Sequence, residues 1–372
     1  MPENKVCIIT TVHAPFDGRI FHKEGKSLQK KGHNVTLIAP HSGDETVDGI
    51  KIVALPKAAN RFMRIFGLGT TSLFLALREK ADIYHFHDPE LLVMGLLLKM
   101  FSGKKIIYDV HEDYSAAIHN KYWLPPFLRS TVALMFDIVE NLCAGSFDGI
   151  IAATPEIARK FPALKTFVIR NLPVYEMIYK TSPLNIKKGK PVLIYAGSLS
   201  YIRGIKEIIQ AAGLLEGMVQ LWLIGEWETE EYKNECEMLR GWQFVSYFGI
   251  KKLNEVYAYM KTADIGLHCI YQLPRYQKGL PIKYFEYMAC GIPAILSGSN
   301  YWEELFHNCA LFVDPRSPED IAEKVMRLIS DKGLREGLIE NGKKLIDGEY
   351  NWETESRSFL ESYEGFMGRD HV

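Results

Sequence analysis

The 372-residue sequence lacks the signatures that assign many proteins to a functional class at first sight. Its six cysteines include no C-x-x-C pair, which fits a reducing compartment and gives no zinc signature. Its 44 basic and 45 acidic residues leave a net charge of -1, so the chain has no basic surplus with which to bind nucleic acid. We therefore expect no metal site and no nucleic-acid partner.

Long apolar segments are also missing. The most apolar internal run is "LLVMGLLLKMF", about half of the ~20 residues that a membrane span needs. The first residues, "MPENKVCIITT", are too polar ahead of their short apolar run to form a signal peptide. The sequence therefore predicts a cytoplasmic protein. No G-x-G-x-x-G dinucleotide loop and no G-x-x-x-x-G-K-[ST] phosphate loop follows any expected strand.

The chain does contain β-rich runs that alternate with helical patterns in two separate halves. The first half holds "VCIITT", "NVTLIAP", "DIYHFH", "KKIIYDVH" and "GIIAAT"; the second holds "PVLIYAG", "VQLWLIG", "FVSYFG", "DIGLHCI", "PAILSG" and "ALFVDP". This alternation predicts an α/β protein with two Rossmann-like, doubly wound parallel-sheet domains facing a deep cleft.

The expected boundaries follow the interruption of this pattern. An N-terminal domain is expected over 1–172, a linker rich in Pro, Lys and Asn over 173–190, and a second domain over 191–350. A C-terminal helix over 351–372 is expected to pack back toward the first domain. Ligands of such domains bind at the carboxyl ends of the strands, so functional residues are sought in the loops that follow strands.

The loop after the first strand reads "TTVHAPFDGRIFHKEG" and brings His13, Asp17 and Arg19 toward the expected cleft. Asp17 or Gly18 is placed to cap a helix that runs to Lys31. Arg19 falls in the first turn of that helix, where a cation is disfavoured by the helix dipole. This placement favours an anionic ligand nearby.

Two further strand ends carry histidines. "YHFHDPELL" places His85 and His87 on one strand face, and "YDVHEDY" brings His111 to the end of a neighbouring strand. Such a cluster is compatible with a metal site, but Asp88 is explained as an N-cap before a proline and the spacing matches no standard zinc signature. His111 is therefore interpreted as a hydrogen-bonding group of a pocket, with a core histidine as the alternative.

The second half has two candidate donor elements. "YAGSLSYIRGIKEII" ends a strand at Gly197 and carries Arg203 just before a helix, a position suited to binding phosphate. In "KGLPIKYFEYMACGIPAI", Glu286 lies at the edge of a helical apolar face, three residues after Lys283. Glu286 is compatible with a simple helix ion pair, worth roughly 0.2–0.5 kcal/mol, and with a carboxylate that binds sugar hydroxyls.

The segments "GSLSYIRGI", "YFGIKKLNEVYAYMKTADIGL" and "PIKYFEYMACGIPAI", together with "YDVHEDY", resemble the retaining glycosyltransferases of family 4, which have the GT-B fold. "HDPELL" and "VHEDY" are similar to the subgroup that acts in bacterial polysaccharide and cell-surface glycan assembly. The resemblance implies that Glu286 binds the ribose of a nucleotide-diphosphate sugar and that Arg203 binds the diphosphate. It also implies that His111 faces the transferred sugar and that Gly249 and Ile250 pack on the base.

The resemblance thus assigns catalytic roles to His111 and Arg203, and it groups the expected donor-binding residues as Gly197, Ser198, Arg203, Gly249, Ile250, Lys278, Ile282, Lys283 and Glu286. The residues expected on the acceptor side or in the cleft are His13, Asp17, Arg19 and His87. Two of these residues depart from the family pattern. Lys278 stands where the family often has a second glutamate, and Ser198 stands where an arginine is usual, so the missing positive charge is assigned to Lys278, Lys283 or Arg19.

These features predict a retaining hexosyl- or N-acetylhexosaminyltransferase that uses a UDP- or GDP-sugar, needs no cofactor, and acts on a glycan or lipid-linked saccharide. The alternatives are a nucleotide-sugar epimerase of GT-B architecture and a non-catalytic nucleotide-sugar-binding subunit. The segments "NRFMRIF" and "KYWLPPFLR" are compatible with peripheral contact to the inner face of a membrane, and equally with core helices that carry a basic rim.

Overall fold

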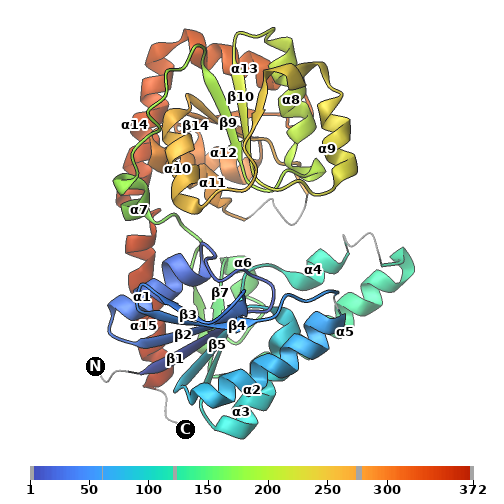
Figure 1. The fold of residues 1–372 in the computed structure, drawn as a ribbon, viewed down its shortest axis with the longest axis vertical. Helices are drawn as coiled ribbons and strands as arrows, with labels where there is room; N and C mark the ends of the chain where they lie inside the picture. The colour runs from blue at the N-terminus through green and yellow to red at the C-terminus, as the bar shows by residue number, and fades with distance from the viewer. Residues whose placement is uncertain (1–3, 61, 120–123, 274–278, 369–372) are drawn as a thin grey trace. The chain divides into compact units, whose positions relative to one another are not determined.

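The computed structural model describes residues 4–60, 62–119, 124–273 and 279–368, without the side chain of Phe66. The chain forms two compact units, the first made of 1–171 and 354–372 and the second of 172–353 (Figure 1). Each unit is a sheet covered by helices, and each is described below by itself.

The sheet of the first unit has eight strands in the order β3-β4-β2-β1-β5-β6-β7-β8. All neighbouring strands run parallel except β3, which pairs antiparallel with β4 at one edge. The strands are β1 (Lys5–Ile9), β2 (Asn34–Pro40), β3 (Glu45–Val47), β4 (Ile50–Leu55), β5 (Ile83–Phe86), β6 (Lys105–Val110), β7 (Gly149–Ala152) and β8 (Thr166–Val168).

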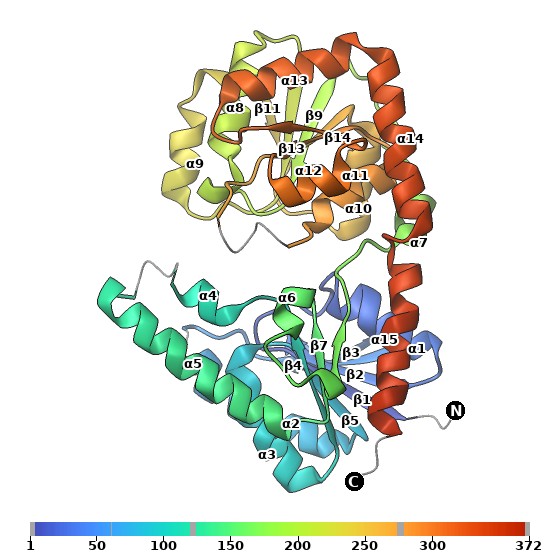
Figure 2. The ribbon, with the colours of Figure 1, turned by 180° about the vertical axis from the view of Figure 1, so that it is seen from behind.

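Helices cover both faces of this sheet because right-handed crossovers that move toward opposite edges lie on opposite faces. One face carries the π-helical turn η1 (Ile20–Gly25) with α1 (Lys26–Lys30), and α15 (Trp352–Met367) packs there from the far end of the chain (Figure 2). The other face carries the turn η2 (Met63–Leu68) with α2 (Gly69–Glu79), α3 (Leu92–Ser102) and α5 (Pro126–Ser146). Three short helices lie at strand ends: η3 (Pro89–Leu91), α4 (Tyr114–Ile118) and α6 (Pro155–Ala158).

The second unit has a six-stranded parallel sheet in the order β11-β10-β9-β12-β13-β14. Its strands are β9 (Val192–Ala196), β10 (Gln220–Ile224), β11 (Val245–Tyr247), β12 (Ile265–His268), β13 (Ala294–Ser297) and β14 (Ala310–Val313). Its helices are α7 (Tyr175–Lys180), α8 (Ile205–Leu214), α9 (Glu230–Glu237), α10 (Leu253–Thr262), α11 (Ile282–Cys290), α12 (Asn300–Phe306), α13 (Pro318–Ser330) and α14 (Lys332–Gly348).

Strand β9 shows why the strands of this sheet have continuous apolar sequences. All five of its residues are buried, and alternate side chains belong to two different cores. Ile194 packs with α10 and α11 residues, whereas Leu193 and Tyr195 pack with α8 residues. A strand covered by helices on both faces has no solvent-facing side and therefore carries no polar alternation.

The doubly wound parallel α/β architecture is confirmed, and all six strands expected in the second half are present. Ser317 caps α13 through a bond from the backbone N–H of Asp320, as predicted. The stretch expected to be a linker contains helix α7, which the interruption of the pattern did not suggest.

Candidate functional site

The loop after β1 is fastened to the end of β5 by Asp88. The Oδ2 atom of Asp88 accepts hydrogen bonds from the Thr10 hydroxyl at 2.9 Å and from the Thr11 backbone N–H at 2.6 Å. Asp88 precedes Pro89 as expected for an N-cap, but its side chain makes no capping bond to the turn that follows. The expected N-cap position of Asp88 is confirmed, but its buried carboxylate fixes the loop that carries His13 in place of the helix start.

His13 and Asp17 lie together on that loop. His13 Nδ1 is 3.5 Å from Asp17 Oδ2, and His13 Nε2 is 3.7 Å from Asp88 Oδ1. Burial favours the neutral ring, but the carboxylates of Asp17 and Asp88 raise the pKa of His13 above its ordinary value. Asp17 also accepts hydrogen bonds from the backbone N–H groups of Arg19 and Ile20, so Asp17 rather than Gly18 caps the helix start.

Arg19 is buried and has its charge neutralised within the unit. Its guanidinium donates to both oxygens of Asp109, at 2.9 and 3.1 Å, and to the Ile169 carbonyl. Its Nε also lies 2.7 Å from Glu24 Oε1. The expectation that Arg19 attracts an anionic ligand or supplies the missing donor-site charge is therefore wrong, because two internal carboxylates already use that charge.

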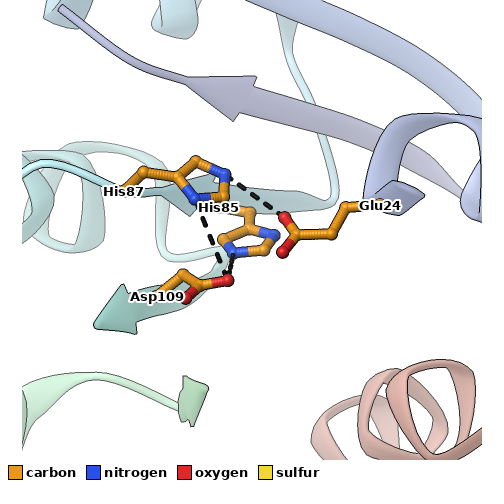
Figure 3. A group of neighbouring side chains, drawn as sticks. All are labelled: Glu24, His85, His87 and Asp109. Atoms are coloured by element: carbon orange, nitrogen blue, oxygen red, sulfur yellow. Dashed lines mark ion pairs between the residues drawn. The ribbon is translucent and has the colours of Figure 1, made fainter. Parts of the chain in front are cut away.

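Glu24, His85, His87 and Asp109 form a fully buried cluster around this guanidinium (Figure 3). Their nearest nitrogen and oxygen atoms all lie within 4.8 Å of one another. Such groups are ligand types for a divalent metal. Arg19 already supplies the positive charge that the carboxylates require, so a metal would have to displace the guanidinium from both of them. The residues present fit an internally neutralised cluster better than a metal site.

One guanidinium cannot neutralise two buried carboxylates. The two carboxyl groups of the cluster accordingly differ in pKa. Burial opposes ionisation of Asp109, but Arg19 and His111 hold the pKa of this carboxyl well below its usual range. Burial and the charge of Asp109 raise the pKa of Glu24 well above its usual range, so Glu24 is the protonated member. Burial lowers the pKa of His85 and of His87, so both rings are neutral.

His111 is the member of this network that reaches the surface, with 19% of its side chain exposed. Its Nε2 lies 3.3 Å from Asp109 Oδ1 and 3.1 Å from His87 Nδ1. A proton on Nε2 therefore faces acceptors on both sides, which leaves Nδ1 as the acceptor atom of the ring. The two histidine-bearing strand ends meet as the sequence predicted.

Three residues of this network were missed by sequence reasoning. Glu24 and Asp109 read as ordinary members of a helix and a strand, and the sequence gives no sign that Arg19 joins them. Tyr363 lies on α15, yet its hydroxyl is 2.6 Å from His85 Nδ1. Only the alternation in "YDVH", which places Asp109 on the same strand face as His111, could have suggested the Asp109 contact.

In the second unit, the ends of β9 and β10 approach each other closely at two glycines. A Cβ on Gly225 would lie 1.8 Å from the carbonyl oxygen of Gly197. Gly204, which starts α8, has a positive φ of 65°, and a Cβ there would lie 2.3 Å from the Cys269 carbonyl oxygen. These positions leave no room for a side chain, so the backbone is closely packed at both ends of the segment that carries Ser198 and Arg203, and Tyr201–Arg203 forms a short 3-10 helix within it.

Glu286 is 2% exposed, and both of its carboxylate oxygens have partners. The Lys283 ammonium lies 2.6 Å from Oε2, and the Tyr257 hydroxyl donates to Oε1 at 3.1 Å. The helix ion pair left open by the sequence is thus present, but the carboxylate is buried and not part of a surface pair. The side chain of Lys283 is 19% exposed and separates Glu286 from solvent.

His268 ends β12 and was not expected from the sequence. It is 1% exposed, and neither ring nitrogen has a hydrogen-bond partner among the described residues. Burial lowers the pKa of His268 well below its ordinary value, and the positive charges of Arg203 and Lys283 lower it further. Gly204 packs on the Cys269 carbonyl oxygen, and the His268 ring lies 5.2 Å from the Tyr284 ring. Arg203 and Lys283 therefore each adjoin a residue in contact with the carboxyl end of β12.

The remaining expected donor residues are distributed as follows. Gly249 and Ile250 follow β11 at the same sheet edge, with Gly249 at a φ of 65° and Ile250 exposed. Ile282 is the first residue of α11. Lys278 lies outside the described residues.

A cavity of about 770 Å³ also opens at this edge, near the ends of β13 and β14. Its lining includes Glu303, Asp314 and Asp320 but none of the expected donor residues. The three carboxylates outnumber the one arginine in the lining, Arg316, and repel a diphosphate, so this cavity is not the expected donor site.

Comparison with known families agrees with this architecture. The family model described as "Glycosyltransferase Family 4" matches residues 18–166, and the model described as "Glycosyl transferases group 1" matches residues 180–345. The protein is a glycosyltransferase with the GT-B fold. The two matches fall on the first and second unit respectively.

The glycosyltransferase has relatives of both full and partial length. It is 23% identical to an uncharacterized glycosyltransferase of Methanocaldococcus jannaschii over 98% of this chain and 100% of that protein. It is 26% identical to N,N'-diacetylbacillosaminyl-diphospho-undecaprenol alpha-1,3-N-acetylgalactosaminyltransferase of Campylobacter jejuni over 45% of this chain and 42% of that protein. Anabaena HepE, solved with UDP and glucose, superposes with a TM-score of 0.76 at 16% identity, covering 97% of this chain and 100% of HepE. None of the described helices is both long enough and apolar enough to cross a membrane.

Proposed function

We propose that this glycosyltransferase moves a hexosyl or N-acetylhexosaminyl group from a nucleotide-diphosphate donor to a hydroxyl acceptor, with retention at the anomeric carbon. The observation that supports the proposal is that Arg203 and the Lys283–Glu286 ion pair both adjoin residues packed at the carboxyl end of β12. Two cations beside a buried carboxylate match the needs of a diphosphate next to a ribose. The UDP bound to HepE supports this class of donor.

Donor binding requires Lys283 to exchange partners. In the free protein its ammonium occupies Glu286 Oε2. A diphosphate offers this flexible ammonium a stronger site, and the released carboxylate oxygen can then accept hydrogen bonds from the ribose hydroxyls. Tyr257 keeps Glu286 oriented during this exchange because it bonds the other oxygen. Lys283 thereby supplies the positive charge that Ser198 does not.

The reaction breaks the bond between the anomeric carbon and the diphosphate oxygen. Arg203 and Lys283 stabilise the negative charge that develops on the departing diphosphate. The position at which the family often carries a second glutamate is Lys278, which cannot act as a carboxylate nucleophile. We therefore favour a front-face attack, in which the leaving phosphate oxygen takes the proton of the acceptor hydroxyl and no covalent enzyme intermediate forms.

His111 is the proposed contact to the transferred sugar. With its Nε2 proton directed to Asp109, its Nδ1 is available to accept a hydrogen bond from a sugar hydroxyl. Asp109 and His87 orient the ring and are positioning residues. His13, whose pKa is raised, is a further candidate for contact to the acceptor.

The proposed acceptor is a lipid-linked saccharide at the cytoplasmic face of a membrane, in glycan or polysaccharide assembly. The Campylobacter jejuni relative carries an undecaprenol-linked acceptor in its name, which supports this class. Donor base, donor sugar and acceptor are identified by the same experiment. Binding of UDP-, GDP- and ADP-sugars is screened by thermal shift, because a ligand of the folded state raises its melting temperature.

The stabilising donor is then incubated with the protein and with lipid-linked or soluble saccharides, and the products are analysed. A new glycosidic bond with the donor's anomeric configuration is the expected result. An inverted linkage would overturn retention, an epimerised donor would indicate an epimerase, and donor binding without turnover would indicate a non-catalytic subunit.

A further inference from the structure

Helix α5 exposes an uncharged, largely apolar side to solvent. Its exposed large side chains are Leu134, Met135, Ile138, Val139 and Leu142, which recur at helical spacings of three and four. The other exposed positions of α5, from Pro126 to Ser146, also carry no charge. A solvent-facing helix side normally carries the polar residues of the helix.

The charged residues of α5 face the protein instead. Glu140 is 1% exposed and accepts a hydrogen bond from the Tyr108 hydroxyl at 2.8 Å. Asp137 is paired with Lys160, and Arg129 donates to the Leu124 carbonyl. The inner side of α5 is apolar as well, with Cys143 and Ala144 in the core, so α5 is apolar on both sides. Its outer apolar side lacks a partner among the described residues.

The apolar side continues over the neighbouring helices, because η2, α2, α3 and α5 lie side by side on one face of the first sheet (Figures 1 and 2). On α3 the exposed side chains include Met100 and Phe101, and on η2 and α2 they include Met63 and Phe74. We call the exposed apolar side chains of these helices the apolar face. Large apolar side chains exposed on adjacent helices are typical of sites of protein or membrane contact.

We propose that the apolar face lies on the surface of an anionic lipid bilayer, with α5 parallel to the membrane plane. This inference deepens the proposed function and rests on it for the identity of the acceptor. The evidence for the membrane contact itself comes from the first unit alone. It also assigns a role to "NRFMRIF" and to the Phe127–Leu128 end of "KYWLPPFLR", whose exposed side chains exclude the alternative of core helices.

Charge favours a bilayer over a second copy of the chain as the occupant. Within 62–104 and 124–146, the charged residues in exposed positions are Arg78, Lys80 and Lys104, all of them cationic. The acids at the border are paired with lysines: Glu79 with Lys51, Asp82 with Lys104, and Asp148 with Lys99. Since Lys104 is already paired with Asp82, the cations that remain for anionic headgroups are Arg78 and Lys80, and these described ranges hold no acid in an exposed position.

The position of the apolar face relative to His111 fits this contact. Met63 in η2 and Phe127 in α5 lie toward the carboxyl ends of the strands, the edge at which His111 follows β6. A bilayer on the apolar face therefore reaches the same edge as His111. A saccharide linked to a lipid of that bilayer would be presented there without leaving the membrane surface.

The test measures partition of the full chain onto sedimented vesicles of phosphatidylcholine with phosphatidylglycerol, and onto vesicles of phosphatidylcholine alone. The double variant Leu134→Gln/Ile138→Gln removes apolar area without adding charge, and Arg78→Gln/Lys80→Gln removes charge alone. Met238→Glu is the control, because Met238 is even more exposed than Leu134 and Ile138 but belongs to the second unit. Melting temperatures check that each variant is folded.

We expect wild type and Met238→Glu to bind the anionic vesicles and the Leu134/Ile138 variant to bind at least about tenfold more weakly. The Arg78/Lys80 variant should lose the preference for anionic over neutral vesicles. Absence of wild-type binding overturns the proposal; if light scattering then shows a dimer that the Leu134/Ile138 variant disperses, the occupant is a second copy. Calorimetric titration of UDP into the same samples is independent of vesicle binding, so failure of the lipid contact and failure of the donor assignment are distinguished.

Discussion

The two units bury carboxylates in different ways. In the first unit, Asp109 and Glu24 are joined to Arg19, and all three side chains are at most 3% exposed. In the second unit, Glu286 is equally buried, but its cation is Lys283, a flexible side chain that is 19% exposed. The first arrangement cannot release its cation without leaving two acids unpaired. A partly exposed lysine can leave its partner more readily than a buried guanidinium, so we expect the ion pair of the second unit to be the more adjustable of the two.

Removal of Arg19 is expected to have the largest effect on stability. Arg19→Met should lower the free energy of unfolding by about 3–5 kcal/mol, because it leaves the buried, ionised Asp109 without a compensating charge. Lys283→Met should cost less, about 1–3 kcal/mol, since Tyr257 still bonds Glu286. Urea denaturation of both variants measures the difference. Equal losses, or a larger loss for Lys283→Met, would contradict the contrast between the two units.

The rigid cluster is proposed to serve His111, so a change at His111 should affect turnover more than folding. His111→Ala should lower turnover by roughly 10²-fold, the scale of one hydrogen-bonding group that acts in the transition state. Donor affinity should stay within a few-fold because the donor residues belong to the other unit. Initial rates and calorimetry on one preparation separate the two effects. Unchanged turnover with a lowered melting temperature would place His111 among purely structural residues.

The unequal protonation of the cluster predicts a pH dependence. Because the pKa of Glu24 is raised in the folded state, the unfolded chain loses this proton first as pH rises, and the folded state loses stability above about pH 4.3. Glu24→Gln cannot ionise, so its stability should fall less than that of wild type between about pH 5 and about pH 8. Asp109 is ionised in both states over this range and contributes no slope. Parallel stability curves for the two proteins would show that Glu24 is not protonated.

The smallest expected effect is the change in activity on removal of divalent metal ions by a chelator. Arg19, Arg203 and Lys283 supply the positive charge in the two units, so activity should survive EDTA. Assays after dialysis against EDTA, with and without added manganese or magnesium, measure this directly. A complete loss that either ion restores would identify Glu24, His85, His87 and Asp109 as a metal site after all.

Strand positions and the juxtaposition of His87 with His111 were predictable because both depend on local periodicity and on the rule that parallel strand ends share one edge. Contacts between charged residues far apart in the sequence were not predictable. Arg19 looked misplaced at a helix start, since its partners Asp109 and Glu24 become neighbours only through the π-helical turn and the strand order. Asp88 read as an N-cap because a proline follows it, yet its partners lie almost eighty positions earlier in the chain. Local patterns carry no information about such contacts.

The burial of Glu286 was also beyond the sequence. The spacing from Lys283 predicted their contact correctly, but a spacing of three does not reveal whether a pair faces solvent or the protein interior. His268 was missed for the same reason, because a histidine inside an apolar strand run gives no sign of the two cations that face it. The helix face of α5 is a further case, since its apolar spacing reads equally well as a core.

The most direct test of the adjustable donor site is calorimetric titration of UDP and GDP into wild type and Glu286→Gln. The substitution keeps the shape of the side chain and one acceptor oxygen but removes the charge that strengthens the bond to ribose hydroxyls. We predict that affinity for the preferred nucleotide falls by roughly 1.5–3 kcal/mol, about ten- to over a hundredfold, with little change in folding. Wild-type affinity in Glu286→Gln would contradict the assignment and leave Glu286 as the partner of Lys283 alone.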